Sequence, residues 1–208
     1  AVDLPGHGRS QGAPLDTIDA MADWLADIVD VLDFAPSIIV GHSMGSLVAY
    51  RFAVDHPDRC RAIALLGTSV PMPVTDALLN AAADNDHAAI EMINTWSHSS
   101  HGKVGANSNP GVWMMGTGER LLERASRGVL HADLGACHRF AEVSDEVICP
   151  ALVIAAGADL MTPARAGLEV AKALPNANVV NLDGCGHFML SERPNEVLNA
   201  LATFATGI

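Results

Sequence analysis

Three residues have the chemical types that nucleophilic catalysis at a carbonyl carbon requires: Ser43, Asp159 and His187. Ser43 stands at the centre of the segment GHSMG, which matches the pattern G-x-S-x-G. Gly41 and Gly45 on either side of it are expected to relieve crowding in a strained turn. A serine hydroxyl needs a base that takes its proton, and the base needs a carboxylate that fixes its tautomer. Where this pattern lies between a strand and a helix, the partners follow in the order Ser, Asp or Glu, His. The sequence has that order and therefore predicts a catalytic triad.

The acid and the base both follow predicted strands. Asp159 comes after an apolar run, in a Gly-Ala-Asp turn, and His187 comes after another, in a glycine-rich turn. Because residues just past the carboxyl ends of parallel strands gather at one edge of a sheet, we expect both beside Ser43. Asp183 is a competing carboxylate. It lies on the same turn as His187, four residues before it, and is less well placed to reach Nδ1.

Alternating strands and helices indicate an α/β fold with a parallel sheet. Apolar or β-branched runs typical of buried strands lie at 37–40, 61–66, 151–155 and 178–182. Helices are expected at 16–34, 44–55, 163–174 and from about Pro194 onward. Ser43 then falls between a strand and a helix, which is the setting that its motif requires.

One long segment, 67–150, interrupts this alternation. A crossover between parallel strands needs only about a dozen residues, and long structureless loops are rare in compact domains. We therefore expect a helical cap at 71–140, inserted between two parts of a core at 1–70 and 141–208. Within the cap, we expect helices at 75–83, 87–96 and 119–130 and a loop rich in glycine and serine at 97–118.

Several large side chains in and near the cap are candidates for a substrate pocket. These candidates are His42, Trp96, Trp113, Met114 and Phe188. The tryptophan and methionine side chains are explained equally well as the small core of the cap itself. For His42, which occupies the variable position of the GHSMG motif, a structural role is the favoured alternative.

Composition limits the class of protein and its partners. The chain has 208 residues, 50% hydrophobic and 17% charged, so it can bury a core and is not a disordered segment. Its formal net charge of −12 repels phosphate backbones, so nucleic acid is not an expected partner. No apolar run approaches the roughly 18 residues that a membrane span needs, and the expected location is cytoplasmic.

Possible metal ligands are scattered along the chain. The four cysteines lack the paired spacing of a disulfide framework or a zinc site. His98 and His101, with Cys137 and His138, contain ligand types, but the first two lie in the predicted loop with no carboxylate near them in sequence. We expect no metal and no cofactor.

Four motifs together resemble the α/β-hydrolase superfamily, most closely its bacterial serine esterases and lipase-like members. They are DLPGHGRS at 3–10, GHSMG at 41–45, GAD at 157–159 and GCGHF at 184–188. The resemblance covers nearly the whole chain outside the cap. It implies that Ser43 is the nucleophile, His187 the general base and acid, and Asp159 the carboxylate that orients His187. It also implies that the backbone N–H of Met44, the residue after the nucleophile, is one donor of the oxyanion hole.

The sequence departs from the family pattern at its start. Family members carry further strands before the DLPGHG turn and a His-Gly loop that supplies the second oxyanion donor. The sequence contains neither, so either natural sequence precedes Ala1 or the sheet is rearranged. A strand ending at Val2 would then stand apart from the strand at 38–40, and we expect open strand edges through which copies of the chain associate.

The sequence thus predicts a serine hydrolase that cleaves a small-molecule carboxylic ester through an acyl-enzyme intermediate. Other reactions of the same triad stay open: those of an aminopeptidase, a lactonase, a C–C hydrolase or a cofactor-free perhydrolase. They stay open because specificity lies in the cap rather than in the serine turn. A non-catalytic protein of this fold that binds a ligand is the alternative from a different class.

Overall fold

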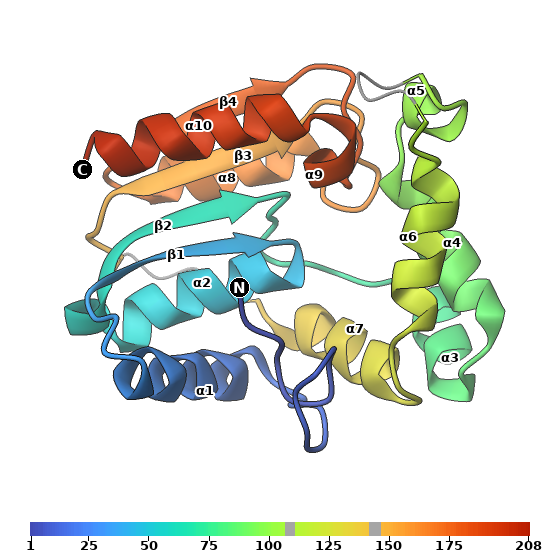
Figure 1. Cartoon of the computed structure of the whole chain (residues 1–208), viewed down its shortest axis with the longest axis horizontal. Helices are drawn as coiled ribbons and strands as arrows, with labels where there is room; N and C mark the ends of the chain where they lie inside the picture. Colours follow the sequence, from blue (N-terminus) through green and yellow to red (C-terminus); the bar gives the residue numbers. More distant parts are fainter. Residues whose placement is uncertain (107–110, 142–146) are drawn as a thin grey trace.

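A four-stranded sheet forms the centre of the computed structural model, which describes residues 1–106, 111–141 and 147–208. The strands are β1 (Ser37–His42), β2 (Cys60–Leu66), β3 (Ala151–Ala156) and β4 (Ala177–Leu182). They lie in the order β1-β2-β3-β4, and every neighbouring pair is parallel (Figure 1). The predicted α/β fold with a parallel sheet is therefore confirmed.

The two middle strands are the most deeply buried elements. Every residue of β2 and β3 except Arg61 is buried. Along β2, Ile63 and Leu65 belong to the apolar cluster on one face of the sheet, whereas Ala64 and Leu66 belong to the cluster on the other. Burial on both faces explains why these strands are near-continuous apolar runs in the sequence.

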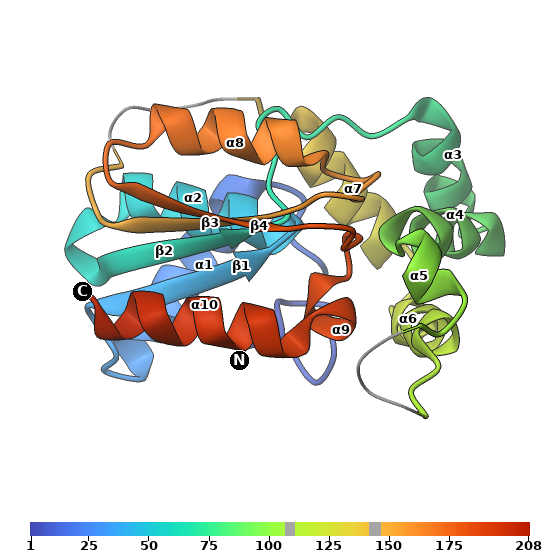
Figure 2. The same ribbon diagram turned by 90° about the horizontal axis from the view of Figure 1, so that it is seen from above.

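Helices cover both faces of the sheet (Figure 2). On one face lie α1 (Ile18–Val31), α2 (Met44–Asp55) and α8 (Ala164–Ala173). On the other lie α9 (Met189–Glu192) and α10 (Pro194–Thr206). Pro194 stands in the first turn of α10, where a missing N–H costs nothing.

In its described residues, the chain between β2 and β3 forms a group of helices. They are α3 (Asp76–Asp84), α4 (His87–Ser97), α5 (Ser100–Lys103), α6 (Met114–Glu123) and α7 (Val129–Arg139). Helices α3 to α6 lie beyond the carboxyl ends of the strands (Figures 1 and 2). A third apolar cluster, which includes Leu78, Ile93 and Leu134, joins α3, α4 and α7. The division into a core and a cap stays a prediction, and the predicted core segment from 141 begins beside residues 142–146, which lie outside the described part of the chain.

Two expectations for this segment are wrong. The predicted loop at 97–118 contains α5 and the start of α6, although its residues 107–110 lie outside the described ones. The predicted helix at 119–130 is divided, because α6 ends at Glu123 and α7 begins at Val129. Gly118, which suggested a loop, is buried in α6, and a Cβ there would come within 2.7 Å of Asn94 Oδ1 on α4. Close packing of α6 on α4 thus outweighs the low helix propensity of glycine.

β1 lies at one edge of the sheet. Among the described residues it pairs with β2 alone, and Val40 is 50% exposed. The predicted strand ending at Val2 is not formed. In the described structure, Ala1 and Val2 belong to no strand and are not part of the sheet. Association of copies through this edge stays a prediction. None of the described helices is both long and apolar enough to cross a membrane.

Candidate active site

The GHSMG segment forms a tight turn between β1 and α2, with Ser43 at its apex. Ser43 has φ 54° and ψ −121°, a backbone conformation that costs a residue with a side chain about 1–3 kcal/mol. Its N–H donates to the carbonyl oxygen of Leu66 at the end of β2, at 2.9 Å. The turn therefore holds Ser43 at the carboxyl edge of the sheet in a strained conformation, as a nucleophile elbow does.

The two glycines of the turn differ in what surrounds them. A Cβ on Gly41 would lie 1.9 Å from the carbonyl oxygen of Gly45, so no larger residue fits at position 41 without moving the backbone. A Cβ on Gly45 would meet nothing within 4 Å. The expectation that both glycines relieve crowding is right for Gly41 and wrong for Gly45.

His187 and Asp159 form a buried pair. Nδ1 of His187 lies 2.7 Å from Oδ2 of Asp159, and the two side chains are 3% and 0% exposed. Thr162 donates to the same carboxylate twice, from its hydroxyl to Oδ2 and from its backbone N–H to Oδ1, each at 2.8 Å. With Nδ1 carrying the proton, Nε2 of His187 is left as the acceptor. Sequence reasoning missed Thr162, although its position three residues after Asp159 in the same turn was a usable signal.

The charge state of Asp159 follows from these contacts. Burial alone would raise the pKa of Asp159, but the hydrogen bond and charge of His187 and the hydrogen bonds from Thr162 outweigh it, so the pKa lies below its usual value. The competing carboxylate Asp183 is exposed and accepts instead from the side chain of Asn181 at 2.6 Å. The structure thus brings Asp159, and not Asp183, to His187.

His42 contacts His187 from another side. Its Nε2 lies 2.8 Å from the backbone carbonyl oxygen of His187 and donates to it, and the two ring centroids are 4.7 Å apart. Burial of the ring, and secondarily the nearby His187, lower the pKa of His42 to about 4, so the ring is neutral at pH 7. His42 contacts the backbone of His187 and does not line the cavity beside Ser43, and its place in a substrate pocket stays a prediction.

The N-terminus of α2 lies directly after Ser43. Met44 is the first residue of that helix, so its N–H has no partner within the helix. This N–H lies at the positive end of the helix dipole. Among the described residues, the hydrogen bonds of the His187 side chain run to Asp159 and Thr162, and none joins Nε2 to Ser43. Such bonds are often long in unliganded enzymes and shorten when substrate binds.

A cavity of about 110 Å³ opens beside Ser43. Most of its lining is apolar and comes from the segment after β2, from α3, α4 and α7, and from the turn after Asp159. The lining residues are Ser43, Met72, Pro73, Val74, Thr75, Leu78, Trp96, Leu134, Cys137, Leu160, Met161 and Thr162. The cavity therefore lies between the sheet edge and the inserted helices.

Of the predicted pocket residues, Trp96 alone lines this cavity. Trp113 is 66% exposed, and Met114 is 2% exposed at the start of α6. Phe188 packs edge-on against His98, with ring centroids 5.0 Å apart. These three residues do not line the cavity beside Ser43, and a role for them in a substrate pocket stays a prediction.

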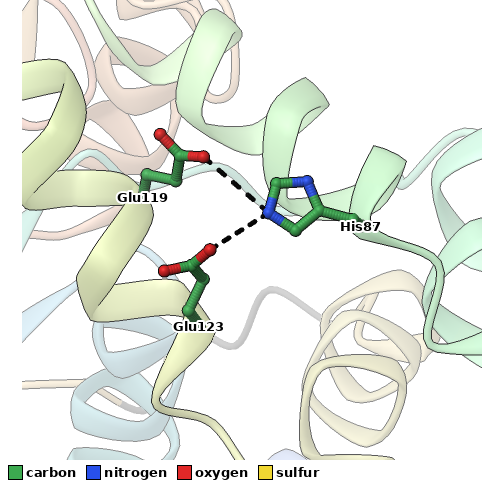
Figure 3. Close-up of side chains that lie close together, drawn as sticks. All are labelled: His87, Glu119 and Glu123. Atoms are coloured by element: carbon green, nitrogen blue, oxygen red, sulfur yellow. Dashed lines mark hydrogen bonds and ion pairs between the residues drawn. The ribbon is translucent and has the colours of Figure 1, made fainter.

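One group of side chains in the described residues could hold a metal ion: His87 of α4 with Glu119 and Glu123 of α6 (Figure 3). Nε2 of His87 lies 3.2 Å from Glu123 Oε1 and 3.8 Å from Glu119 Oε1, and all three side chains are between 38% and 48% exposed. Their ion pairs raise the pKa of His87, chiefly through the hydrogen bond to Glu123. The arrangement is that of a solvated ion-pair cluster between two helices. The residues weighed earlier as metal ligands, His98, His101, Cys137 and His138, form no such group in the described structure.

Comparison with known protein families and sequences gives a consistent picture. A family model described as the Alpha/beta hydrolase family matches residues 1–201. A pimeloyl-[acyl-carrier protein] methyl ester esterase from Chromobacterium violaceum is 30% identical over 97% of this chain and 81% of its own length. A putative non-heme bromoperoxidase from Mycobacterium tuberculosis is 25% identical over 99% of the chain and 82% of its own length.

Solved structures agree in fold. A thermophilic esterase superimposes with a TM-score of 0.85 at 25% identity, over 99% of this chain and 79% of its own. An enol-lactonase from Burkholderia xenovorans superimposes with a TM-score of 0.86 at 22% identity, over 98% of this chain and 79% of its own. The matched proteins share one architecture and differ in the reactions named for them.

Proposed function

This chain belongs to the alpha/beta hydrolase family, and on that premise we propose that it is a serine hydrolase that cleaves carboxylic esters. The observation that carries the proposal is the buried hydrogen bond between His187 and Asp159 at 2.7 Å. It leaves Nε2 of His187 as a proton acceptor, at the same sheet edge as the strained Ser43. Ester hydrolysis is also the reaction named for the esterase relative at 30% identity.

In the first half-reaction, Ser43 Oγ attacks the ester carbonyl carbon while His187 Nε2 takes the hydroxyl proton. The carbonyl oxygen gains negative charge, which the Met44 N–H stabilises, and the ionised Asp159 stabilises the imidazolium. The tetrahedral intermediate then collapses. The C–O bond to the alcohol breaks, and the alcohol leaves with the proton from His187, so that an acyl-serine remains.

In the second half-reaction, water replaces the alcohol. His187 Nε2 takes a proton from the water as the water oxygen attacks the acyl carbon. The bond from the acyl carbon to Ser43 Oγ then breaks, Oγ takes the proton from His187, and the carboxylic acid leaves. The charges balance at each step because the proton passes through one nitrogen, Nε2, in both directions. Asp159 stays ionised throughout and orients the ring.

The cavity beside Ser43 supports a short acyl group as the preferred substrate part. An apolar cavity of about 150 Å³ holds one benzene molecule, so the roughly 110 Å³ here suits an acyl chain of a few carbons. Leu78, Trp96 and Leu134 bring side chains from the inserted helices to this cavity. Their position supports our proposal that 71–140 acts as a cap over the site.

Labelling with a fluorophosphonate tests the proposal, since the probe needs an activated serine and little substrate fit. We expect covalent labelling at Ser43, and faster turnover of p-nitrophenyl acetate and butyrate than of the octanoate.

Ser43→Ala should lose both labelling and turnover, with a fall in kcat on the order of 10⁶-fold, while its melting temperature stays close to the wild type. Ser126→Ala, at an exposed serine between α6 and α7, is the matched control. Labelling or turnover that persists in Ser43→Ala would show that another residue does the chemistry. Parallel assays with lactone, amide and peroxide-dependent substrates identify a different reaction of the same triad.

A further inference from the structure

A second carboxylate is buried near the candidate active site, and the proposed mechanism does not use it. Glu192, the last residue of α9, is 4% exposed. A buried carboxylate is costly unless hydrogen bonds replace its water. Glu192 has three such bonds: from the N–H of Ser99 to Oε1 at 2.8 Å, from the Ser99 hydroxyl to Oε2 at 2.6 Å, and from the N–H of Gly186 to Oε2 at 3.1 Å.

These bonds reach the residue directly before His187. Gly186 is bound to Glu192, and on the other side of His187 the N–H of Phe188 donates to the carbonyl oxygen of Ser97 at 3.0 Å. The backbone on both sides of the proposed base is therefore anchored to the segment that follows α4. Ser99 belongs to that segment, so Glu192 joins the inserted helices to the loop that carries His187.

All the partners of Glu192 in the described structure are donors. Both of its oxygens accept, which fits a carboxylate and not an amide. An amide of the same size would turn its NH₂ group toward either the N–H of Ser99 or the N–H of Gly186. The fit is also tight, because a Cβ on Gly186 would come within 2.6 Å of Glu192 Oε1. Both terminal atoms of the side chain at position 192 must therefore be hydrogen-bond acceptors.

We propose that Glu192 is a positioning residue that fixes the backbone of His187, and with it the bond from His187 Nδ1 to Asp159. This inference rests on the proposed function in one respect, because the predicted change in kcat requires that the protein hydrolyses esters. Loss of one carboxylate oxygen as an acceptor should let the loop that carries His187 shift. A misplacement of a catalytic side chain by about 1 Å can lower kcat by about 10²-fold. Substrate binding uses the cavity beside Ser43, which Glu192 does not line, so KM should stay nearly the same.

Glu192→Gln tests the proposal against the matched control Glu196→Gln, which makes the same change at an exposed glutamate of α10. The readouts are kcat and KM for p-nitrophenyl butyrate, the melting temperature, and the low-field proton resonance of the bond from His187 Nδ1 to Asp159. We expect Glu192→Gln to lower kcat about 10- to 10²-fold, to leave KM within about twofold, and to shift or broaden the resonance. Glu196→Gln should change none of these.

A second variant, Ser99→Ala, tests the proposal in the event that Glu192→Gln does not fold. Ser99→Ala removes one bond to Glu192 and keeps the charge and the bond from Gly186, so it should change kcat and the resonance in the same direction but less. If Glu192→Gln does not fold, Ser99→Ala decides. A folded variant with a lower melting temperature but unchanged kcat and resonance would overturn the proposal and leave Glu192 a purely structural residue. If the wild type neither hydrolyses esters nor takes the fluorophosphonate, the proposed function fails, and the resonance alone decides the role of Glu192.

Discussion

At the scale of single residues, two aspartates near His187 differ in what they contact, and this difference is open to direct test. Asp159 holds Nδ1 of His187, whereas Asp183 is bound to Asn181. Asp159→Asn should lower kcat by as much as about 10⁴-fold, because the amide favours the wrong imidazole tautomer. Asp183→Asn should leave kcat near the wild-type value. Steady-state kinetics of the two purified variants measure the contrast, and a larger loss in Asp183→Asn would mean that the carboxylate is misassigned.

His42 makes a second residue-scale prediction, about pH and stability. Its pKa is about 4 in the folded protein and about 6.5 in an unfolded chain, so between these values the unfolded state binds more protons. The free energy of unfolding should therefore fall as the pH decreases through this window. His42→Gln can keep a donor to the His187 carbonyl oxygen and does not titrate, so part of that fall should disappear. Urea titrations at pH 7 and pH 4.5 measure it, with the exposed His101→Gln as control. A pH dependence equal to the wild type would mean that His42 is not desolvated in the folded protein.

The residues that sequence reasoning found and missed differ in how far their contacts reach. Ser43, Asp159 and His187 each stand in a short glycine-rich motif, so local spacing was enough to select them. Glu192 is different. It meets Ser99 across 93 residues of sequence, and no local pattern marks either one. Long-range hydrogen bonds of this kind arise from the packing of α9 beside the segment after α4, which a single sequence does not reveal.

At the scale of elements, the turn between β1 and α2 makes unequal demands on its two glycines. Gly41→Ala would press a Cβ onto the backbone of Gly45, so we expect a marked loss of soluble protein or melting temperature, together with loss of activity. Gly45→Ala meets open space in the first turn of α2 and replaces a poor helix former, so it should stabilise the protein by about 0.5–1 kcal/mol. Thermal unfolding of the pair tests this. Equal effects of the two substitutions would contradict the geometry of the turn.

The elements themselves were predictable to different degrees. The strands were placed within two residues. β2 and β3 carry a continuous apolar signal because they are buried on both faces, whereas the partly exposed β1 and β4 are marked by their β-branched residues. α6 was displaced, since Gly116 and Gly118 are breakers by propensity, yet both are buried within that helix. Tertiary contacts decide such segments, and they lie outside the reach of local propensity.

At the scale of the whole molecule, the net charge of −12 should act on charged substrates. At about 0.01 M salt the screening length is about 30 Å, and at 0.15 M it is about 8 Å. The KM for an anionic ester such as p-nitrophenyl hemisuccinate should therefore fall when salt is added, because repulsion is screened. The KM for neutral p-nitrophenyl butyrate should not change. Kinetics at the two salt concentrations give the comparison, and a salt effect on both esters alike would point away from charge repulsion.

The order of strands in the sheet also bears on how the chain folds. β1 and β2 are joined by residues 43–59, and β3 and β4 by residues 157–176, whereas residues 67–150 separate β2 from β3. Loop-closure entropy adds about 0.6 kcal/mol for each doubling of length, so joining β2 to β3 costs at least about 1.2 kcal/mol more than forming either outer pair. We expect the two β-α-β units to form first and to pack against each other last. Pulsed hydrogen exchange during refolding can follow this order, and simultaneous protection of all four strands would contradict it.

Ser43 belongs to the first unit, and Asp159 and His187 belong to the second or follow it. Enzymatic activity should therefore return only with the slowest phase of refolding.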